Sequence, residues 1–285
     1  MNSIEKIKLV EIEIFSYCNR KCSFCPNSEN SFRQDKTNKK SLNFTSYQNL
    51  IGQLKDLNYQ GVISFSRYNE PLSFFDCTKK YVDYCKSILP NKIVANTNGD
   101  YLDSDRLSLF DELTIMDYAD RGKDWWIARL EKYQAKLVGQ DDNFLLFKSL
   151  NQKDILVFLE FKKNATVEDR GGILRAEQVK LKLKNNWETR KTPCLEPQKF
   201  LGIDYNGKVV TCCNMQSDYH KDYVIGDINN TNLVSILDDK KRADIIKIMS
   251  STEYTNYLAP CLTCQKVPGR YTRDNPGIIY NNERK

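Results

Sequence analysis

Three cysteines near the start of the chain follow C-x3-C-x2-C spacing: Cys18, Cys22 and Cys25. Thiolates spaced this closely bind zinc or an iron–sulfur cluster, and a closed site of either kind takes four ligands. A three-ligand site leaves one metal position free to bind and activate another molecule. The alternative is a structural zinc site with a distant fourth ligand, but the only histidine, His220, lies far downstream among polar residues. We therefore favour a cluster with one open iron.

A second set of cysteines lies in the last third of the chain. It follows the pattern C-x12-G-x4-C and then C-x2-C, with members Cys194, Cys212, Cys261 and Cys264. The dipeptide Asn206-Gly207 predicts a two-residue β-hairpin, which would return Cys212 to the neighbourhood of Cys194. Four thiolates complete a closed metal site. By ligand type alone, zinc is the alternative occupant.

Length and composition limit the possible classes of protein. The 285 residues suffice for one large α/β domain with a small appendage. No stretch approaches the roughly 18 apolar residues of a membrane span, and Met1–Phe15 has no signal-peptide core. We therefore expect a cytoplasmic protein without a membrane partner, in which the abundance of cysteine, ten in all, argues for metal ligands rather than disulfides. The net charge of +6 is spread among mixed charges, which does not indicate nucleic-acid binding.

Strand and helix patterns alternate around the first cysteines. Val10, Ile12 and Ile14 alternate with charged residues, as in a strand with one apolar face, and the cysteine loop begins where this strand ends. Later strands are predicted near 61–66, 92–95, 113–116, 144–147 and 155–161, and helices near 50–57, 74–89, 104–110 and 126–137. About six strand–helix units predict an α/β fold, a partial (β/α)6 TIM-like barrel. Such folds carry their chemistry at the C-terminal ends of the strands.

Polar residues occur at several of these strand ends. Glu13 would point to the barrel interior as a candidate catalytic residue, although pairing with a lysine or arginine is an alternative. The turn Asn69-Glu70-Pro71 exposes carbonyls and a carboxylate that can receive an ammonium group. In Asn98-Gly99-Asp100, the glycine frees the backbone, and Asn98 or Asp100 can reach a ribose hydroxyl. Arg170 offers a cationic fork beside two glycines.

The first cysteine motif, with Phe24 before its third cysteine, resembles the signature of radical S-adenosylmethionine enzymes. The resemblance implies a [4Fe–4S] cluster on Cys18, Cys22 and Cys25, whose fourth iron chelates S-adenosylmethionine. Reduction of that cluster then releases a 5′-deoxyadenosyl radical. The turn at 69–71 is similar to the family's Gly-Gly-Glu-Pro motif, which binds the amino group of S-adenosylmethionine, except that Asn69 replaces a glycine.

The second cysteine set resembles the auxiliary-cluster modules of the same family, in the short "twitch" form of the SPASM domain. This implies a second [4Fe–4S] cluster on those four cysteines. The longer form needs several further cysteines, and none follows Cys264. The implied organisation is a barrel over residues 1–185 and a small twitch domain, a β-hairpin plus a helix with a polar tail, over residues 186–285.

Several motifs resemble family members that oxidise an aminocyclitol alcohol to a ketone, among them Cys18–Ser28, Thr97–Asp100 and Arg170–Leu174. The implied substrate is a small molecule, a secondary alcohol of a cyclitol, sugar or nucleotide-sugar. Arg170 would lie beside it, the second cluster would accept an electron, and an external flavodoxin or ferredoxin would supply reductant.

Two other radical reactions remain open. A peptide-modifying maturase is one, although the 17 residues before Cys18 are too few for a peptide-recognition domain. The other is an epimerase in which the Cys213 thiol returns a hydrogen atom to the substrate. Neighbouring strand positions face opposite sides, so Cys213 is not expected to share the environment of Cys212.

Overall fold

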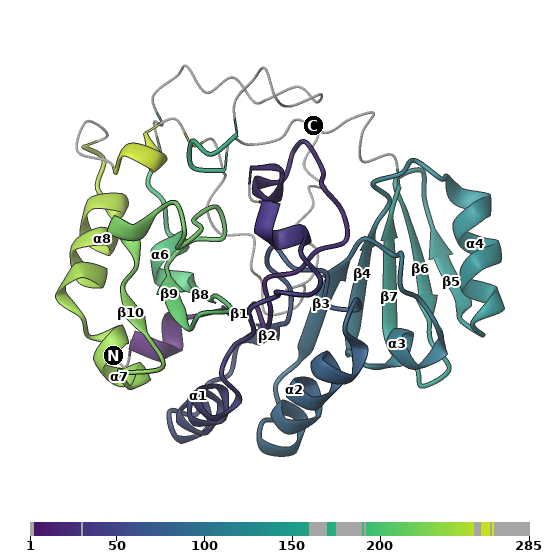
Figure 1. Cartoon of the computed structure of the whole chain (residues 1–285), viewed down its shortest axis with the longest axis horizontal. Coiled ribbons are helices and arrows are strands. Elements are labelled where there is room, and N and C mark those ends of the chain that lie inside the picture. Colours follow the sequence, from purple (N-terminus) through teal and green to yellow (C-terminus); the bar gives the residue numbers. More distant parts are fainter. Residues whose placement is uncertain are drawn as a thin grey trace.

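The computed structural model describes residues 3–29, 31–159, 170–174, 190, 192–253, 258–262 and 264. One sheet of ten strands runs through this part of the chain, in the order β10-β9-β8-β1-β2-β3-β4-β7-β6-β5 (Figure 1). The six neighbouring strands from β8 to β7 are parallel, and the strands added at either edge are antiparallel. The strands are β1 Leu9–Ile12, β2 Val62–Ser64, β3 Ile93–Thr97, β4 Glu112–Met116, β5 Lys136–Gln140, β6 Phe144–Lys148, β7 Asp154–Phe158, β8 Phe200–Ile203, β9 Lys208–Val210 and β10 Gly226–Asp227.

The helices pack against the sheet and complete the main apolar core. The α-helices are α1 Phe44–Asp56, α2 Phe75–Ile88, α3 Ser104–Ser108, α4 Lys123–Lys132, α6 Glu196–Lys199, α7 Leu233–Leu237 and α8 Lys240–Ser250. Short 3-10 helices are η1 Ser3–Lys6, η2 Pro26–Ser28, η3 Ser31–Gln34, η4 Lys221–Tyr223 and η6 Ala259–Cys261. Helix α1 is capped by Asn43, whose side chain accepts a hydrogen bond from the backbone N–H of Ser46. No helix in the described ranges has the length and apolar character needed to cross a lipid bilayer.

Side chains of the parallel strands alternate between an outer and an inner face. Val10 and Ile12 of β1 are fully buried in the main core, which they share with the helices. Leu9 belongs instead to a separate inner cluster that spans four parallel strands, with Val62, Val94 and Phe200. A sheet that buries apolar residues on both faces and curves around an inner cluster confirms the predicted partial barrel.

One predicted barrel strand and one predicted helix differ from the structure. Residues 144–147 are not a parallel strand, because β6 pairs antiparallel with both β5 and β7. The sixth parallel strand is β8, which comes from the C-terminal part and lies beside β1. The predicted helix over 126–137 ends at Lys132, since Gln134 has a left-handed backbone with φ 62°, and Leu137 lies in β5. A short apolar run fits either strand direction, so the pattern alone did not decide between them.

The predicted hairpin is confirmed, but its loop is longer than the two residues predicted, because Asp204 pairs with Lys208 and three residues lie between them. Strands β8 and β9 are antiparallel, with Gly202 opposite Val210, and Asn206-Gly207 lies in the turn between them. Gly207 has φ 82°, a conformation that favours glycine. The boundary predicted between residues 185 and 186 lies outside the described residues.

Candidate functional site

The loop after β1 brings the first three cysteines together around a cavity. Cys18, Cys22 and Cys25 line a space of about 550 Å³, counting its open mouth, together with Phe24, Asn69, Glu70 and Asn98. The loops after β1, β2 and β3 supply these residues, so the cavity lies at the C-terminal ends of the parallel strands. Pro71, next to Glu70 in the chain, is buried, and its carbonyl accepts a hydrogen bond from the Thr78 hydroxyl.

The Glu70 carboxylate ties the turn after β2 to the turn after β3. Its Oε1 accepts from the Leu72 N–H at 3.1 Å and the Thr97 hydroxyl at 2.6 Å, and its Oε2 accepts from the Asn98 N–H at 2.8 Å. Its burial, with 2% exposed, raises the pKa of Glu70 to about 7, despite the opposing effect of these three hydrogen bonds. Glu70 therefore fixes the shape of the cavity, and one lone-pair site, on Oε2, stays available to a ligand.

The pKa of Glu70 leads to a prediction for stability. In the metal-free protein, the raised pKa means that the folded state binds the Glu70 proton more tightly than the unfolded state does. Protonation of Glu70 therefore stabilises the fold, and this contribution is complete below about pH 4.5. It is lost as the pH rises through about 7. We expect the free energy of unfolding of the wild type, relative to Glu70→Gln, to fall by up to about 3 kcal/mol over this range. Denaturant unfolding of both proteins at several pH values measures this difference, and a pH-independent difference would contradict the prediction.

Asn98 and Asp100 anchor the cysteine loop. Asp100 accepts hydrogen bonds from Arg20 Nε at 2.7 Å and from the Asn19 side chain at 2.8 Å, and Asn98 donates to Asn19 Oδ1 at 2.8 Å. The neighbouring arginine contributes to lowering the pKa of Asp100 against its partial burial. Asn98 lines the cavity whereas Asp100 is not among its lining residues. The ribose contacts stay a prediction, and the carboxylate of Asp100 is already engaged by the cysteine loop.

Asn69 presents a hydrogen-bond donor that no described residue accepts. Its Oδ1 accepts from the Arg67 N–H at 3.2 Å, and since an N–H can only donate, this contact fixes which amide atom is the oxygen. The amide nitrogen is buried without a partner in a side chain that is 7% exposed. An unmet buried donor is costly, and a ligand rich in oxygen acceptors relieves that cost. The cavity thus fits S-adenosylmethionine beside a three-thiolate cluster.

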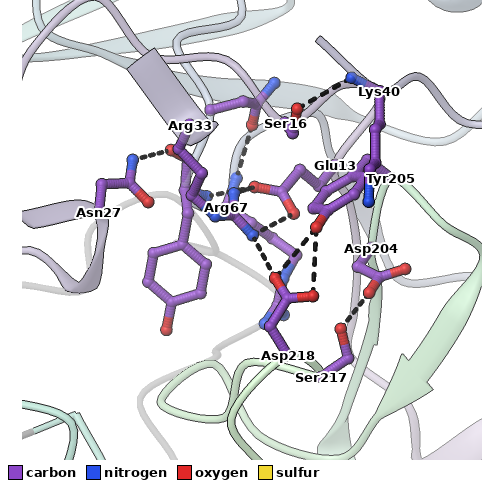
Figure 2. A network of polar contacts seen from close by, with 12 residues as sticks. Glu13, Ser16, Asn27, Arg33, Lys40, Arg67, Asp204, Tyr205, Ser217 and Asp218 are labelled. Carbon is purple, nitrogen blue, oxygen red and sulfur yellow. Dashed lines mark hydrogen bonds and ion pairs between the residues drawn. The ribbon is translucent and has the colours of Figure 1, made fainter. Parts of the chain in front are cut away.

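Glu13 lies behind the cavity rather than in it. Its carboxylate is fully buried and accepts from Arg33 Nη1 at 2.7 Å and from the Tyr68 N–H at 3.1 Å. Figure 2 shows the Arg33 guanidinium among Glu13, Tyr205 and Asp218, with Asp218 at 3.5 Å and the Tyr205 ring centroid at 5.0 Å. The predicted catalytic Glu13 is therefore not among the residues that line the three-cysteine cavity. Glu13 instead forms an ion pair with Arg33, the alternative given by the sequence, because a buried carboxylate requires a charged partner.

The four C-terminal cysteines line a second cavity. Cys194, Cys212, Cys261 and Cys264 surround a space of about 370 Å³, together with apolar residues such as Ile245 and Met249. Among the residues that the structure describes, no three cysteine, histidine, aspartate or glutamate side chains converge as a site for one metal ion. Four thiols around one cavity match the four thiolates that hold a closed [4Fe–4S] cluster. The Asn214 N–H also donates to Cys212 Sγ at 3.4 Å.

His220 serves the backbone rather than a metal. Its Nδ1 accepts from the Gln216 N–H at 3.0 Å, so its Nε2 carries the proton donated to the Gly171 carbonyl at 2.9 Å. Both ring nitrogens are thereby used, which excludes His220 as the fourth ligand of the first site in this structure. This anchor of the turn at 170–174 was not predicted, and nothing local in the sequence indicates it.

The turn at 170–174 lies against the cysteine loop. Arg170 has a left-handed backbone with φ 54°, and its Nη1 donates to Asn214 Oδ1 at 2.9 Å. Leu174 packs against Phe24 in a small apolar cluster with Cys22 and Cys25. Burial raises the pKa of the Cys25 thiol, and the positive charge of Arg170 opposes that shift. The structure thus brings Arg170 near both cysteine sets.

Comparisons with known proteins agree with this geometry. Residues 194–265 match the SPASM family model, described as an iron–sulfur cluster-binding domain. The chain is 26% identical over 247 residues to an S-adenosyl-L-methionine-dependent 2-deoxy-scyllo-inosamine dehydrogenase from Niallia circulans, a match that covers 85% of this chain and 86% of that protein.

Two solved structures are similar in fold. BtrN in complex with AdoMet and 2-DOIA has a TM-score of 0.68 at 22% identity, covering 92% of this chain and 94% of that one. Native anSMEcpe with bound AdoMet and Kp18Cys peptide has a TM-score of 0.51 at 12% identity, covering 85% of this chain and 84% of that one. The predicted resemblance to radical S-adenosylmethionine enzymes with a SPASM-type domain is confirmed by the sequence matches, and the predicted fold by the structures.

Proposed function

We propose that this chain is a radical S-adenosylmethionine dehydrogenase that oxidises a secondary alcohol of a small cyclitol, sugar or nucleotide-sugar to a ketone. The observation that carries the proposal is the pair of cysteine-lined cavities, one with three thiols and an open mouth and one with four. A three-thiolate site suits radical generation, and a closed four-thiolate site suits electron storage. The similarity to a 2-deoxy-scyllo-inosamine dehydrogenase supports an aminocyclitol as the first substrate to test.

The proposed cofactors are two [4Fe–4S] clusters and S-adenosylmethionine. When bound, they supply hydrogen-atom abstraction and accept one electron. Within the chain, Cys18, Cys22 and Cys25 would hold the first cluster, and the four C-terminal cysteines the second. Phe24 and the Asn69-Glu70-Pro71 turn would orient S-adenosylmethionine.

Arg170 is proposed to bind the reacting hydroxyl. Its support is its position between the cysteine loop and Asn214, where a cationic fork can stabilise the negative charge that develops on oxygen as the proton leaves. A guanidinium stays protonated in proteins, so the proton would pass to another acceptor. Asn214 would keep the guanidinium oriented.

The remaining organisation is proposed on sequence grounds. We propose a barrel over residues 1–185 and an auxiliary-cluster domain over residues 186–285. We also propose a cytoplasmic location, because iron–sulfur ligands need a reducing compartment, and a flavodoxin or ferredoxin as one-electron donor. Nucleic acids and membranes are not among the proposed partners.

Replacing Arg170 tests its role and the reaction. The reconstituted, reduced wild type should convert 2-deoxy-scyllo-inosamine to a ketone and form 5′-deoxyadenosine. With substrate deuterated at the carbinol carbon, the deuterium should appear in 5′-deoxyadenosine. Arg170→Gln should lower ketone formation by about 10²- to 10³-fold, the typical effect of losing one charge-stabilising group. Mass spectrometry follows both products.

The matched control is Arg129→Gln on α4, an arginine that stacks on Trp125 away from both cavities. It should leave ketone formation unchanged. A fully active Arg170→Gln protein would remove Arg170 from the reaction. Absence of any ketone from all three classes of alcohol would overturn the proposed dehydrogenase.

An epimerase is the second candidate, because the partly buried Cys213 packs against the inner cluster of the barrel. A dehydrogenase should retain ketone formation in Cys213→Ala, and substrate recovered from deuterated water should contain no carbon-bound deuterium. An epimerase would incorporate solvent deuterium in the wild type and lose that incorporation in the variant. Proton and deuterium NMR of recovered substrate separates the two.

A further inference from the structure

One short stretch of the C-terminal part lines the four-cysteine cavity and is hydrogen-bonded to residues that line the three-cysteine cavity. We name residues 212–216 the bridging segment. Its first residue, Cys212, lines the four-cysteine cavity, and Cys213 packs against the inner cluster of the barrel. The residue that lines the four-cysteine cavity and the residue that packs inside the barrel are therefore direct neighbours in the chain.

Two side chains from the loop after β2 hold the bridging segment. The Tyr68 hydroxyl donates to the Cys213 carbonyl at 2.7 Å, and Arg67 Nη2 donates to the Met215 carbonyl at 2.6 Å. Both side chains also line the three-cysteine cavity. They precede Asn69 and Glu70 directly in the chain, so the loop that shapes the first cavity also holds the segment that leads to the second.

Arg67 is fixed on several sides. Its Nη1 donates to Glu11 Oε2 at 3.1 Å, and its side chain is 2% exposed. Gly202 on β8 leaves the room that the guanidinium occupies, since a Cβ at this glycine would lie 2.2 Å from Nη1. A buried charge with a carboxylate partner and a space shaped for it has little freedom to move. Arg67 therefore links β1 to the bridging segment in one orientation.

We infer that Arg67 and Tyr68 are positioning residues that hold the bridging segment, and with it the Cys212 thiol, at a fixed place relative to the substrate. The inference rests on the proposed function, in which the alcohol loses two protons and two electrons. One proton and one electron leave together as a hydrogen atom; the second proton passes to a base or solvent, and the second electron passes to the four-cysteine cluster. Electron transfer slows steeply with distance, so a loosened segment delays the second electron.

The test uses Tyr68→Phe in the reconstituted protein, with Tyr47→Phe as a matched control. Tyr47 is also buried and donates its hydroxyl to a backbone carbonyl, that of Tyr81, but it lies in α1 on the outer face. Hydrogen exchange of peptides covering 212–216 should be about tenfold faster in Tyr68→Phe, as expected from the loss of one buried hydrogen bond. Tyr47→Phe should leave exchange of these peptides unchanged.

The second readout is the amount of 5′-deoxyadenosine formed per ketone, which should rise several-fold in Tyr68→Phe. Unchanged exchange would overturn the attachment of the segment. Faster exchange with an unchanged product ratio would overturn its role in the reaction. A wild type that forms no ketone would count against the proposed function instead, and the exchange result would still decide the attachment. Arg67→Lys keeps the positive charge but removes the guanidinium, whose two nitrogens donate to Glu11 and to the Met215 carbonyl. It should change both readouts in the same direction.

Discussion

Anaerobic reconstitution should load the wild-type protein with about eight irons and eight acid-labile sulfides per chain, and a Cys194→Ala/Cys212→Ala variant with about four of each. The expected halving follows from the two cavities, because the double variant removes two of the four thiols of one cavity and leaves the other intact. Colorimetric iron and sulfide assays, together with visible absorbance near roughly 400 nm from charge transfer between thiolate and iron, measure the change.

The chain provides a matched control in Cys77→Ala/Cys85→Ala. Both cysteines lie on α2 against the main core and line neither cavity, so this variant should keep about eight irons. About four irons in the wild type, with zinc filling the remainder, would reduce the C-terminal cavity to a structural site. We would then replace dehydrogenation by a redox-neutral radical reaction.

Arg33→Met should lower the free energy of unfolding of the metal-free protein by about 3–5 kcal/mol, the usual result of removing one partner of a buried ion pair. The side chains of Arg33 and Glu13 are 2% and 1% exposed, so the variant leaves a buried carboxylate without its cation. The backbone carbonyl of Arg33 also accepts from the Cys18 N–H at 2.8 Å. Urea unfolding followed by circular dichroism measures the change, and the three-cysteine cavity should load iron less completely.

Two further variants separate the ion pair from a general effect of substitution. Arg33→Met/Glu13→Gln should recover a substantial part of the loss, since the charge left without a partner is removed as well. Arg106→Met should cost less than about 1 kcal/mol, because Arg106 pairs with Asp103 near the surface, with 25% and 42% of the side chains exposed. Equal losses in Arg33→Met and Arg106→Met would contradict the importance of the buried pair.

Features set by neighbouring residues were predictable from sequence. Cys18, Cys22 and Cys25 lie within one short loop because of their spacing in sequence alone, independently of how the rest of the chain folds. The Asn206-Gly207 hairpin and the start of the first strand depend equally on local chemistry. The strand order was not predictable in full, because β8 lies beside β1 through contacts between residues almost 200 positions apart in sequence. Alternating patterns report the exposed face of a strand and carry no information on its neighbour.

The roles of individual residues at the site show the same contrast between local features, which were predictable, and contacts between distant residues, which were not. Glu70 was predicted to matter, and the structure adds that three donors already hold its carboxylate. Glu13 was a candidate catalyst, yet its partner Arg33 lies in the polar loop that follows the cysteines, a pairing that no short-range pattern indicates. His220 and Arg67 likewise act through contacts with distant backbone carbonyls. Sequence reasoning identifies reactive side chains more readily than the residues that hold them.

The position of β8 beside β1 also bears on how the chain folds. During synthesis the strands β1 to β7 emerge long before residues 200–203, and until then β1 forms one edge of the parallel sheet with open backbone donors and acceptors. Such edges recruit other chains, which makes early intermediates prone to aggregation. A fragment ending near residue 185 would keep that edge permanently, so the barrel and the cysteine-rich part are expected to mature as one cooperative unit. Contacts of this sequence separation also slow folding.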